Sequence, residues 1–224
     1  MAEKVKIGVL ASGRGSNLGA IIEAVEAGKI NAEVAVVLSD VSGAYALERA
    51  WSHNIAAEFV DPKPYKGRRE DYDRALFERL RAHGVGLVLL AGYMRIVSTV
   101  LVEAFNNRMM NIHPALLPSF PGLHVQKKAI DHGVKFSGCT VHFVDGGMDT
   151  GPIIIQAVVP VFPCDDEDAL SARILKQEHK IYPEAVKLFC EGRLEVEGRR
   201  VNIKNGPKVP DSFLINPPIK EPTI

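Results

Sequence analysis

Residues 5–27 read Val-Lys-Ile-Gly-Val-Leu-Ala-Ser-Gly-Arg-Gly-Ser-Asn-Leu-Gly-Ala-Ile-Ile-Glu-Ala-Val-Glu-Ala. The apolar run Val5–Ala11 has the length of a buried strand, and the pattern over Asn17–Ala27 is typical of a helix. The short loop Ser12–Asn17 joins the two. A strand that passes through a short loop into a helix begins a βαβ unit, so this stretch points to a parallel sheet.

The alternation of strand and helix continues through the first half of the chain. Tyr72, Leu76 and Leu80 recur every four residues, which indicates a helix. We therefore predict an α/β fold with a Rossmann-like, open, mostly parallel sheet and helices on both faces, ending in a long helix. Ligands of such sheets bind beyond the carboxyl ends of the strands. The further expected strands are Val34–Leu38, Ala57–Val60, Leu87–Ala91 and a short one near Met109–Ile112, and the expected helices are Ala44–His53 and Arg69–His83.

The second half follows a different pattern. Cys139–Val144 and Ile153–Phe162 are strand-like, and the glycine-rich turn Asp145–Gly151 joins them. A long helix is expected from about Asp166 toward Phe189, because acidic residues at its start suit a helix N-terminus. Pro183 should kink this helix or split it, because proline lacks the backbone donor that a helix interior uses.

The C-terminal end differs again in composition. From Lys204 onward the chain carries five prolines and little periodicity, which predicts an extended tail. We therefore expect a single domain over residues 1–203 and a proline-rich tail over residues 204–224.

Composition limits the classes of function. Lys and Arg number 27, as do Asp and Glu, so the zero net charge provides no basic field for nucleic acid or a membrane surface. The three cysteines are well separated and form no CxxC pair, which suits a reducing cytosol and argues against a cysteine-zinc site. The N-terminus has no signal-peptide pattern and the apolar runs are of strand length. We expect a cytoplasmic protein, either monomer or homodimer.

Residues 111–118 read Asn-Ile-His-Pro-Ala-Leu-Leu-Pro. A residue before proline favours an extended backbone, so His113 should be extended and should face the same side as Asn111. An amide beside an imidazole is suited to stabilising an oxyanion and moving a proton. The alternative is a buried polar pair at a strand end whose hydrogen bonds the backbone satisfies.

The loop Ser12–Asn17 lies between a strand and a helix. Free N–H groups at a helix start form an anion site, to which Ser16 and Asn17 can add side-chain donors. The glycines stand at 13, 15 and 19, which is not the dinucleotide-binding spacing. A plain tight turn with a helix cap is the alternative. Asp40, after the second strand, could bind a ribose or could equally belong to a turn.

Asp149 lies in the turn after the strand Cys139–Val144. We expect its carboxylate against His113, where it would raise the imidazole pKa and favour imidazolium. Ordinary turn chemistry is the alternative, and the spacing of Asp145 and Asp149 matches no calcium loop, so no metal is expected. His142 is either a supporting partner of the pair or a satisfied core histidine.

Glu178 lies on the apolar stripe of the last long helix, in line with Ile174, Ile181 and Ala185. An unpaired carboxylate is costly there, so Glu178 either binds a ligand or belongs to a buried ion pair. His179, one step around the helix, is expected to be peripheral.

The segment Gly92–Val97 follows the fourth strand. Its apolar residues could line a slot for a flat heterocycle, with backbone groups that bind its edge, or could pack into the core. Arg69 could meet a carboxylate of a ligand or be solvated.

Taken together, the chain from about Lys6 to Leu194 resembles the folate-dependent formyltransferases. Asn-x-His followed by Asp-x-Gly-Pro marks the wider group, and Gly-x-Gly-Ser-Asn with Gln-Glu-His points to a ribonucleotide substrate. The residues that carry the resemblance are Gly13–Asn17, Ala91–Ile96, Asn111–Pro118, Pro121–His124, His142–Asp145, Met148–Pro152 and Gln177–Pro183.

The resemblance implies a role for each of these segments. Asn111, His113 and Asp149 would be catalytic, with His142 behind them. Gly15, Ser16 and Asn17 would hold the substrate phosphate, and Glu178 the ribose hydroxyls. The implied folate-binding residues are Arg69, Met94, Arg95, Ile96, Val97, Asn111, Val144, Asp145 and Asp149.

The implied reaction is direct transfer of the formyl group of 10-formyltetrahydrofolate, as co-substrate, to the amine of glycinamide ribonucleotide in purine biosynthesis. It needs small-molecule substrates, no metal and no nucleic acid. A formyltransferase acting on tRNA should have a second, RNA-contacting domain and a basic surface, and a formyltetrahydrofolate hydrolase an N-terminal regulatory domain. The pattern is also compatible with a sugar-nucleotide formyltransferase and, least of all, with a non-enzymatic nucleotide-binding module.

Overall fold

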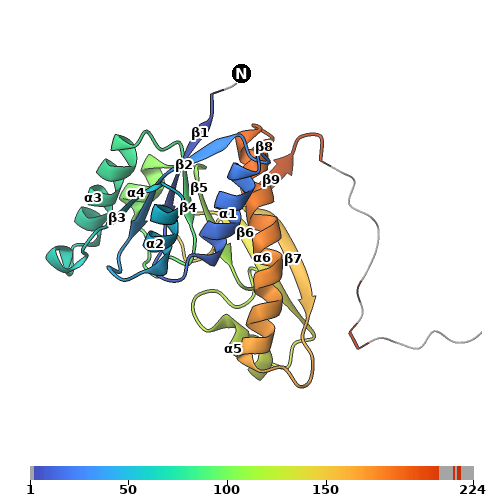
Figure 1. Ribbon diagram of the computed structural model, residues 1–224. Coiled ribbons are helices and arrows are strands. Elements are labelled where there is room, and N and C mark those ends of the chain that lie inside the picture. The colour runs from blue at the N-terminus through green and yellow to red at the C-terminus, as the bar shows by residue number, and fades with distance from the viewer. Residues whose placement is uncertain (1–2, 207–213, 215, 218–224) are drawn as a thin grey trace, which may run out of the picture.

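The computed structural model describes residues 3–206, 214, 216 and 217 (Figure 1). Seven strands form one sheet in the order β3-β2-β1-β4-β5-β6-β7, and a separate hairpin, β8-β9, follows the last helix. The strands are β1 Val5–Leu10, β2 Ala32–Ser39, β3 Ala56–Phe59, β4 Leu87–Leu90, β5 Met109–His113, β6 Phe136–Phe143, β7 Ile153–Pro160, β8 Leu194–Glu197 and β9 Arg200–Ile203.

Helices cover both faces of the sheet (Figure 1). Apolar residues of α1, α2, α5 and α6 share one hydrophobic cluster with alternate residues of the strands. Those of α3 and α4 share a second cluster with the opposite face. The helices are α1 Ser16–Glu26, α2 Tyr45–Ser52, α3 Arg69–Ala82, α4 Thr99–Ala104, α5 Val125–Asp131 and α6 Glu167–Cys190, with a 3-10 turn at Lys63–Tyr65.

The sheet has a parallel part and an antiparallel part. Strands β3, β2, β1, β4 and β5 pair in parallel, whereas β6 pairs antiparallel with both β5 and β7. The chain runs from β1 outward to β3 and then returns to place β4 on the other side of β1, so the order of strands reverses at β1. The carboxyl ends of β1, β4 and β5 therefore open onto a single edge of the sheet, where ligands of such folds bind.

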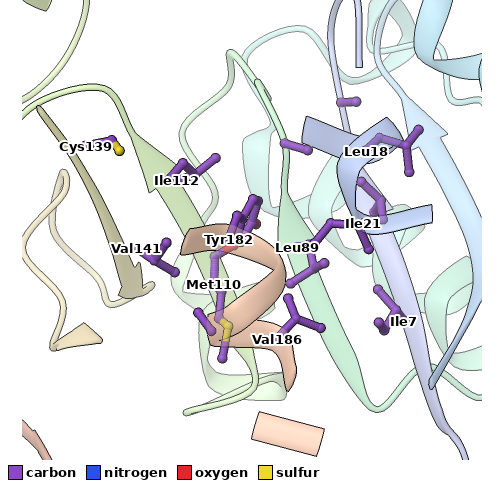
Figure 2. Close-up of a cluster of buried hydrophobic side chains, with 14 of the residues drawn as sticks. Ile7, Leu18, Ile21, Leu89, Met110, Ile112, Cys139, Val141, Tyr182 and Val186 are labelled. Carbon is purple, nitrogen blue, oxygen red and sulfur yellow. The ribbon is translucent and has the colours of Figure 1, made fainter. Parts of the chain in front are cut away.

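The larger cluster packs α6 against the middle of the sheet (Figure 2). Tyr182 of α6 is fully buried beside Leu89 and Met110 of neighbouring strands. Its hydroxyl lies 3.1 Å from each of the carbonyl oxygens of Leu90 and Met110, which share its single proton. Burial of an aromatic ring with a satisfied hydroxyl stabilises the core and fixes α6 over the end of β4 and the start of β5.

The predicted α/β fold is confirmed, with three differences in detail. Helix α6 runs without a break through Pro183, because the buried residues Tyr182, Ala185 and Val186 hold both sides of the proline in the core. The last long helix does not end the fold, since the β8-β9 hairpin follows it. The short helices α4 and α5 were not expected from the periodicity. Most of the predicted 204–224 tail lies outside the described residues, and the division at residue 203 stays a prediction.

Candidate active site

Asn111 and His113 project from the same face of β5. Their neighbours Met110 and Ile112 are buried in the larger hydrophobic cluster, so strand alternation turns Asn111 and His113 to the opposite side. His113 is the last residue of the strand, as expected for the position before Pro114, and only 5% of it is exposed.

Asp149 reaches this pair from the loop between β6 and β7. Its Oδ1 accepts a long hydrogen bond of 3.4 Å from Asn111 Nδ2, and its Oδ2 lies 3.4 Å from His113 Nδ1. Asp149 has a positive φ of 55°, a conformation that Asp tolerates better than most residues. The structure thus brings together the three residues that the sequence singles out, although Asp149 follows Asn111 by 38 positions along the chain.

Both ring nitrogens of His113 face oxygen atoms. Nε2 lies 2.9 Å from the backbone oxygen of Phe120. A carbonyl oxygen only accepts, so Nε2 carries a proton, and in the neutral ring Nδ1 holds the lone pair that faces Asp149. Burial lowers the pKa of His113 and outweighs the opposing effects of the Phe120 carbonyl and the Asp149 charge. Asp149 does raise the pKa of His113 as expected, but burial lowers it further, so the expected preference for imidazolium is not found in the free protein.

Asp149 is held as a carboxylate. Burial alone would raise its pKa, but the neighbouring imidazole of His142, the hydrogen bond from Gly122 and the neighbouring imidazole of His113 lower that pKa overall. The Gly122 N–H donates to Asp149 Oδ2 at 2.9 Å. An anion beside a neutral imidazole is arranged to stabilise the ring once that ring takes up a proton.

His142 stands behind the pair on β6, directly opposite Asn111. Its Nδ1 donates to the Phe143 carbonyl at 2.7 Å, so its Nε2 can accept from Asn111 Nδ2 at 3.3 Å. The same Nε2 lies 3.7 Å from Asp149 Oδ1. Between a core histidine and a supporting partner of Asn111 and Asp149, the geometry favours the supporting partner.

Sequence reasoning missed the turn formed by Phe120 and Gly122. This turn supplies the acceptor for His113 and a donor for Asp149, both from the backbone. Phe120 has a φ of 53°, which is uncommon for a bulky residue. Backbone groups leave no mark in side-chain identity, and the only signal was the turn-forming pair Pro121-Gly122.

The first loop and the last long helix meet at a second polar pair. Asn17, near the start of α1, donates through Nδ2 to Glu178 Oε2 on α6 at 2.7 Å, and both residues are buried. Burial raises the pKa of Glu178, and the Asn17 hydrogen bond opposes that shift only in part. The amide oxygen of Asn17 is buried without a partner among the described residues, so this pair keeps hydrogen-bonding capacity that a polar ligand can use.

Gly15 fixes the entry into α1. It has a φ of 66°, and a Cβ atom there would lie 2.8 Å from the Cβ of Ala46. Gly13 accepts a backbone hydrogen bond from Ala46 at 3.0 Å, so α2 holds the loop from the other side. The N–H groups at the start of α1, beginning with Ser16, are thereby presented at the edge of the sheet.

A cavity of about 530 Å³ extends from this loop between α1, α2 and α6. Ser16 and Gly19 line it from α1, Arg49 from α2 and His179 from α6. The Nε atom of Arg49 and the Nε2 atom of His179 are buried without hydrogen-bond partners in the part of the chain that the structure describes. His179 is therefore not peripheral as expected, and Arg49 was missed because its sequence neighbours carry no motif.

The segment after β4 combines both expected arrangements, because Tyr93 and Val97 pack against the smaller cluster while other apolar side chains are exposed. Met94 is 65% exposed and Ile96 is 53% exposed, whereas Val97 is half-buried against the smaller cluster. Arg95 stacks over the ring of Tyr72 with its guanidinium carbon 4.8 Å from the centroid. These features leave apolar side chains free to contact a flat ligand.

The other residues of the implied folate site lie on either side of this segment. Arg69 is exposed in the first turn of α3. Burial raises the pKa of Asp73, and the charges of Arg69 and Arg95 partly oppose this, so both cations lie near the same part of α3. Val144 follows β6, and Asp145 accepts hydrogen bonds from Gly147 N and Thr150 Oγ1 that order the Asp149 loop.

Residues 3–206 and the few described beyond them lack two kinds of feature. They contain no group of three or more His, Cys, Asp or Glu side chains placed to hold a metal ion. Nor does any helix among them combine the length and the apolarity that a membrane span requires.

Comparisons with known proteins show what the whole chain is similar to. The trifunctional purine biosynthetic protein adenosine-3 of Drosophila melanogaster is 48% identical over 189 residues, which cover 84% of this chain but only 14% of that protein. The chain thus spans about a seventh of the length of that relative. The phosphoribosylglycinamide formyltransferase of Escherichia coli strain K12 is 44% identical over 192 residues, 86% of this chain and 90% of that protein.

The fold comparison gives the same result. The crystal structure of glycinamide ribonucleotide transformylase 1 from Symbiobacterium toebii superposes with a TM-score of 0.89 at 54% identity, over 91% of this chain and 96% of that one. A family model described as formyl transferase matches residues 5–186, which include Asn17, Glu178 and the cluster of Asn111, His113, His142 and Asp149. The chain belongs to the formyl transferase family.

Proposed function

We propose that this chain transfers the formyl group of 10-formyltetrahydrofolate to the amine of glycinamide ribonucleotide in purine biosynthesis. The observation that carries the proposal is the convergence of Asn111, His113 and Asp149 at the carboxyl end of β5. An amide donor, a neutral imidazole and a carboxylate are groups suited to acyl transfer to an amine. The similarity to phosphoribosylglycinamide formyltransferases supports the choice of substrates.

The ribonucleotide binds at the first loop. Its phosphate accepts hydrogen bonds from the N–H groups that follow Gly15, with Ser16 and Asn17 as side-chain donors. Arg49 and His179 line the adjoining cavity and supply donors for an anion there. Glu178 accepts from the ribose hydroxyls, which explains why a carboxylate is retained at a buried position.

The folate binds across the segment after β4. Met94, Ile96 and Val97 provide an apolar surface for its flat ring, and the Val144–Asp149 loop closes the other side. Arg69 and Arg95 carry the positive charge that matches the carboxylates of the folate tail. The residues present therefore fit this co-substrate, and Asn111 and Asp149 place its formyl group beside His113.

The acceptor amine attacks the formyl carbon directly. As the carbonyl oxygen becomes an oxyanion, the Asn111 amide exchanges its long hydrogen bond to Asp149 for one to the oxyanion and lowers the barrier. The negative charge developing beside His113 raises the affinity of its Nδ1 for a proton, so the ring takes the proton that the amine loses. Asp149 stabilises the resulting imidazolium, and that proton then passes to the folate nitrogen as the carbon–nitrogen bond breaks.

The proposal also covers the cellular location and the oligomeric state of the protein. We place the activity in the cytoplasm with small-molecule substrates, and we expect a monomer or a homodimer, since the residues that we propose for the site all belong to one chain. A sugar-nucleotide formyltransferase or a formyltetrahydrofolate hydrolase would use the same catalytic cluster, so the acceptor distinguishes the three.

The test is a steady-state assay of the purified chain. It follows the deformylated folate by absorbance, with 10-formyltetrahydrofolate supplied in the presence and in the absence of glycinamide ribonucleotide. We expect turnover only when the ribonucleotide is present. Folate turnover without it would identify a hydrolase, and absence of turnover in both cases would reject the proposal.

A further inference from the structure

Ser12 occupies the point of the sheet where the order of strands reverses. It follows β1, which lies between β2 and β4. Its backbone N–H donates to the carbonyl of Gly92 at 3.1 Å, and its hydroxyl contacts both the Asp40 carboxylate and the Met94 backbone. A single residue thus joins the end of β2 to the segment that follows β4.

The direction of each of these hydrogen bonds is set by chemistry. A hydroxyl has one proton, and the Asp40 carboxylate only accepts, so Ser12 donates to Asp40 Oδ1 at 2.6 Å. An oxygen lone pair then faces the Met94 N–H, which donates at 2.9 Å. A hydrogen bond to an ionised acceptor is stronger than a neutral one, so Asp40 holds the hydroxyl in the orientation that Met94 needs.

Asp40 is linked to the segment after β4 through the Ser12 hydroxyl. Its position after the second strand is compatible with a ribose-binding acid or with a turn residue. In the structure one of its carboxylate oxygens accepts the hydrogen bond from Ser12. The carboxylate therefore connects to the segment after β4 by way of the Ser12 hydroxyl.

We infer that Ser12, oriented by Asp40, is a positioning residue for the folate segment Met94–Val97. It fixes the backbone at Met94, whose exposed side chain has little packing of its own to hold it. The inference rests on the proposed function in that it takes this segment as the folate site. It assigns no contact between Ser12 and either substrate.

The decisive variant is Ser12→Ala, which leaves the Met94 N–H without its acceptor. Loss of one such hydrogen bond should raise the KM for 10-formyltetrahydrofolate roughly fivefold, because a typical net contribution corresponds to a factor of about 2 to 13. The KM for the ribonucleotide and kcat should change less than about twofold. Binding of tetrahydrofolate, measured by fluorescence without turnover, should weaken by the same factor as the folate KM rises.

Variants at Asp40 distinguish the orientation of the Ser12 hydroxyl from the negative charge of the Asp40 carboxylate. Asp40→Ala removes the acceptor that orients the hydroxyl and should raise the folate KM in the same direction as Ser12→Ala. Asp40→Asn keeps an acceptor oxygen and should have a smaller effect. Ser12→Thr keeps the hydroxyl and should restore a folate KM close to that of the unaltered chain.

Ser39→Ala is the matched control. Ser39 lies one residue from Asp40 and is almost fully buried, and its hydroxyl exchanges hydrogen bonds only with the Val41 backbone among the described residues, at 3.1 Å. It should lower the thermal midpoint about as much as Ser12→Ala but leave the folate KM unchanged. A merely structural role for Ser12 predicts equal behaviour of the two variants.

The outcomes are distinguishable from failure of the proposed function. If the unaltered chain turns over and Ser12→Ala has the same folate KM, or raises both KM values alike, the positioning inference is wrong and the function stands. If the unaltered chain does not turn over but binds tetrahydrofolate, the binding measurement still decides the role of Ser12. If it does not bind tetrahydrofolate, both fail together.

Discussion

The parallel and antiparallel parts of the sheet handle ligands by different physical means. At the end of β1, the proposed phosphate site consists mostly of backbone N–H groups presented by a tight turn, with Gly15 at a positive φ. At the ends of β5 and β6, the site is a cluster of titratable side chains, His113, His142 and Asp149, held by partners from three segments. The first region is suited to recognising a ligand, whereas the second is arranged to move a proton.

The difference shows how each region depends on its surroundings. Backbone donors keep the same chemistry wherever the turn is formed, so the first region needs the right geometry above all. The second region needs the right protonation states as well. Burial lowers the pKa of His113, and neighbouring polar groups lower the pKa of Asp149, so the protonation states of this region depend on how it is packed.

The largest expected effect concerns the second region. His113→Ala should lower kcat by roughly 10²- to 10⁴-fold, the range typical of general acid–base groups, because no other imidazole faces Asp149 Oδ2 within the described residues. Binding of glycinamide ribonucleotide, measured by titration calorimetry, should stay within about twofold of the unaltered chain. If His113→Ala weakened binding of the ribonucleotide as much as it lowered kcat, the second region would not be specialised for moving a proton.

His53→Ala provides the control for loss of a histidine–carboxylate pair. His53 pairs with Glu26 at 2.7 Å and is not part of the proposed site. Its replacement should leave kcat unchanged, since surface ion pairs contribute little even to stability.

A smaller effect is expected from the turn that serves the first region. Gly15→Ala places a side chain at a φ of 66° and brings its Cβ within 2.8 Å of the Ala46 Cβ. A left-handed conformation costs an ordinary residue about 1–2 kcal/mol, so the free energy of unfolding in urea should fall by at least about that amount. The KM for the ribonucleotide should rise while kcat is retained.

Gly13→Ala is the matched control for this substitution. Gly13 lies in the same loop, its φ is not in the left-handed region, and an added Cβ would meet no atom within 4 Å. Its replacement should change the unfolding free energy by less than about 0.5 kcal/mol. Equal destabilisation by the two variants would show that the conformation of Gly15 is not the cause.

The smallest expected effect concerns Glu178, a titratable side chain beside the first loop. It tests whether protonation state also matters in the region that we propose for ligand recognition. Burial raises the pKa of Glu178 above its ordinary value of 4.5, so its ionisation opposes folding. The stability linked to this group is fully present below about pH 4.5 and is lost as the pH rises through the raised value.

Glu178→Gln keeps an acceptor for Asn17 but cannot ionise. The thermal midpoint of this variant, relative to the unaltered chain and without ligand, should therefore increase between about pH 4 and about pH 8. Scanning calorimetry at several pH values measures the difference. A difference that does not vary with pH would mean that Glu178 titrates normally in the folded protein.

Much of the fold was predictable because it depends on neighbours along the chain. Apolar runs and four-residue stripes located the seven strands of the sheet and four of its helices, and the i, i+2 relation placed Asn111 and His113 on one face. The residue before Pro114 was extended for the same local reason. The short helices α4 and α5 were missed because six or seven residues carry too little periodicity to detect.

The convergence of distant residues depended on the tertiary structure. Pairing of β6 antiparallel to β5 brings His142 opposite Asn111 and directs the loop with Asp149 toward His113. The family resemblance anticipated this grouping, yet neither the resemblance nor the spacing indicated the backbone of Phe120 and Gly122 that holds it.

The sequence by its own local chemistry thus specified the strands, the glycine turn at the first loop and the shared face of Asn111 and His113. Only the folded chain decided that burial outweighs Asp149 in setting the pKa of His113, and that Ser12 connects Asp40 to Met94. The reason is physical. Backbone conformation responds to adjacent residues, whereas burial and hydrogen-bond partners are the sum of contacts from segments far apart in the chain.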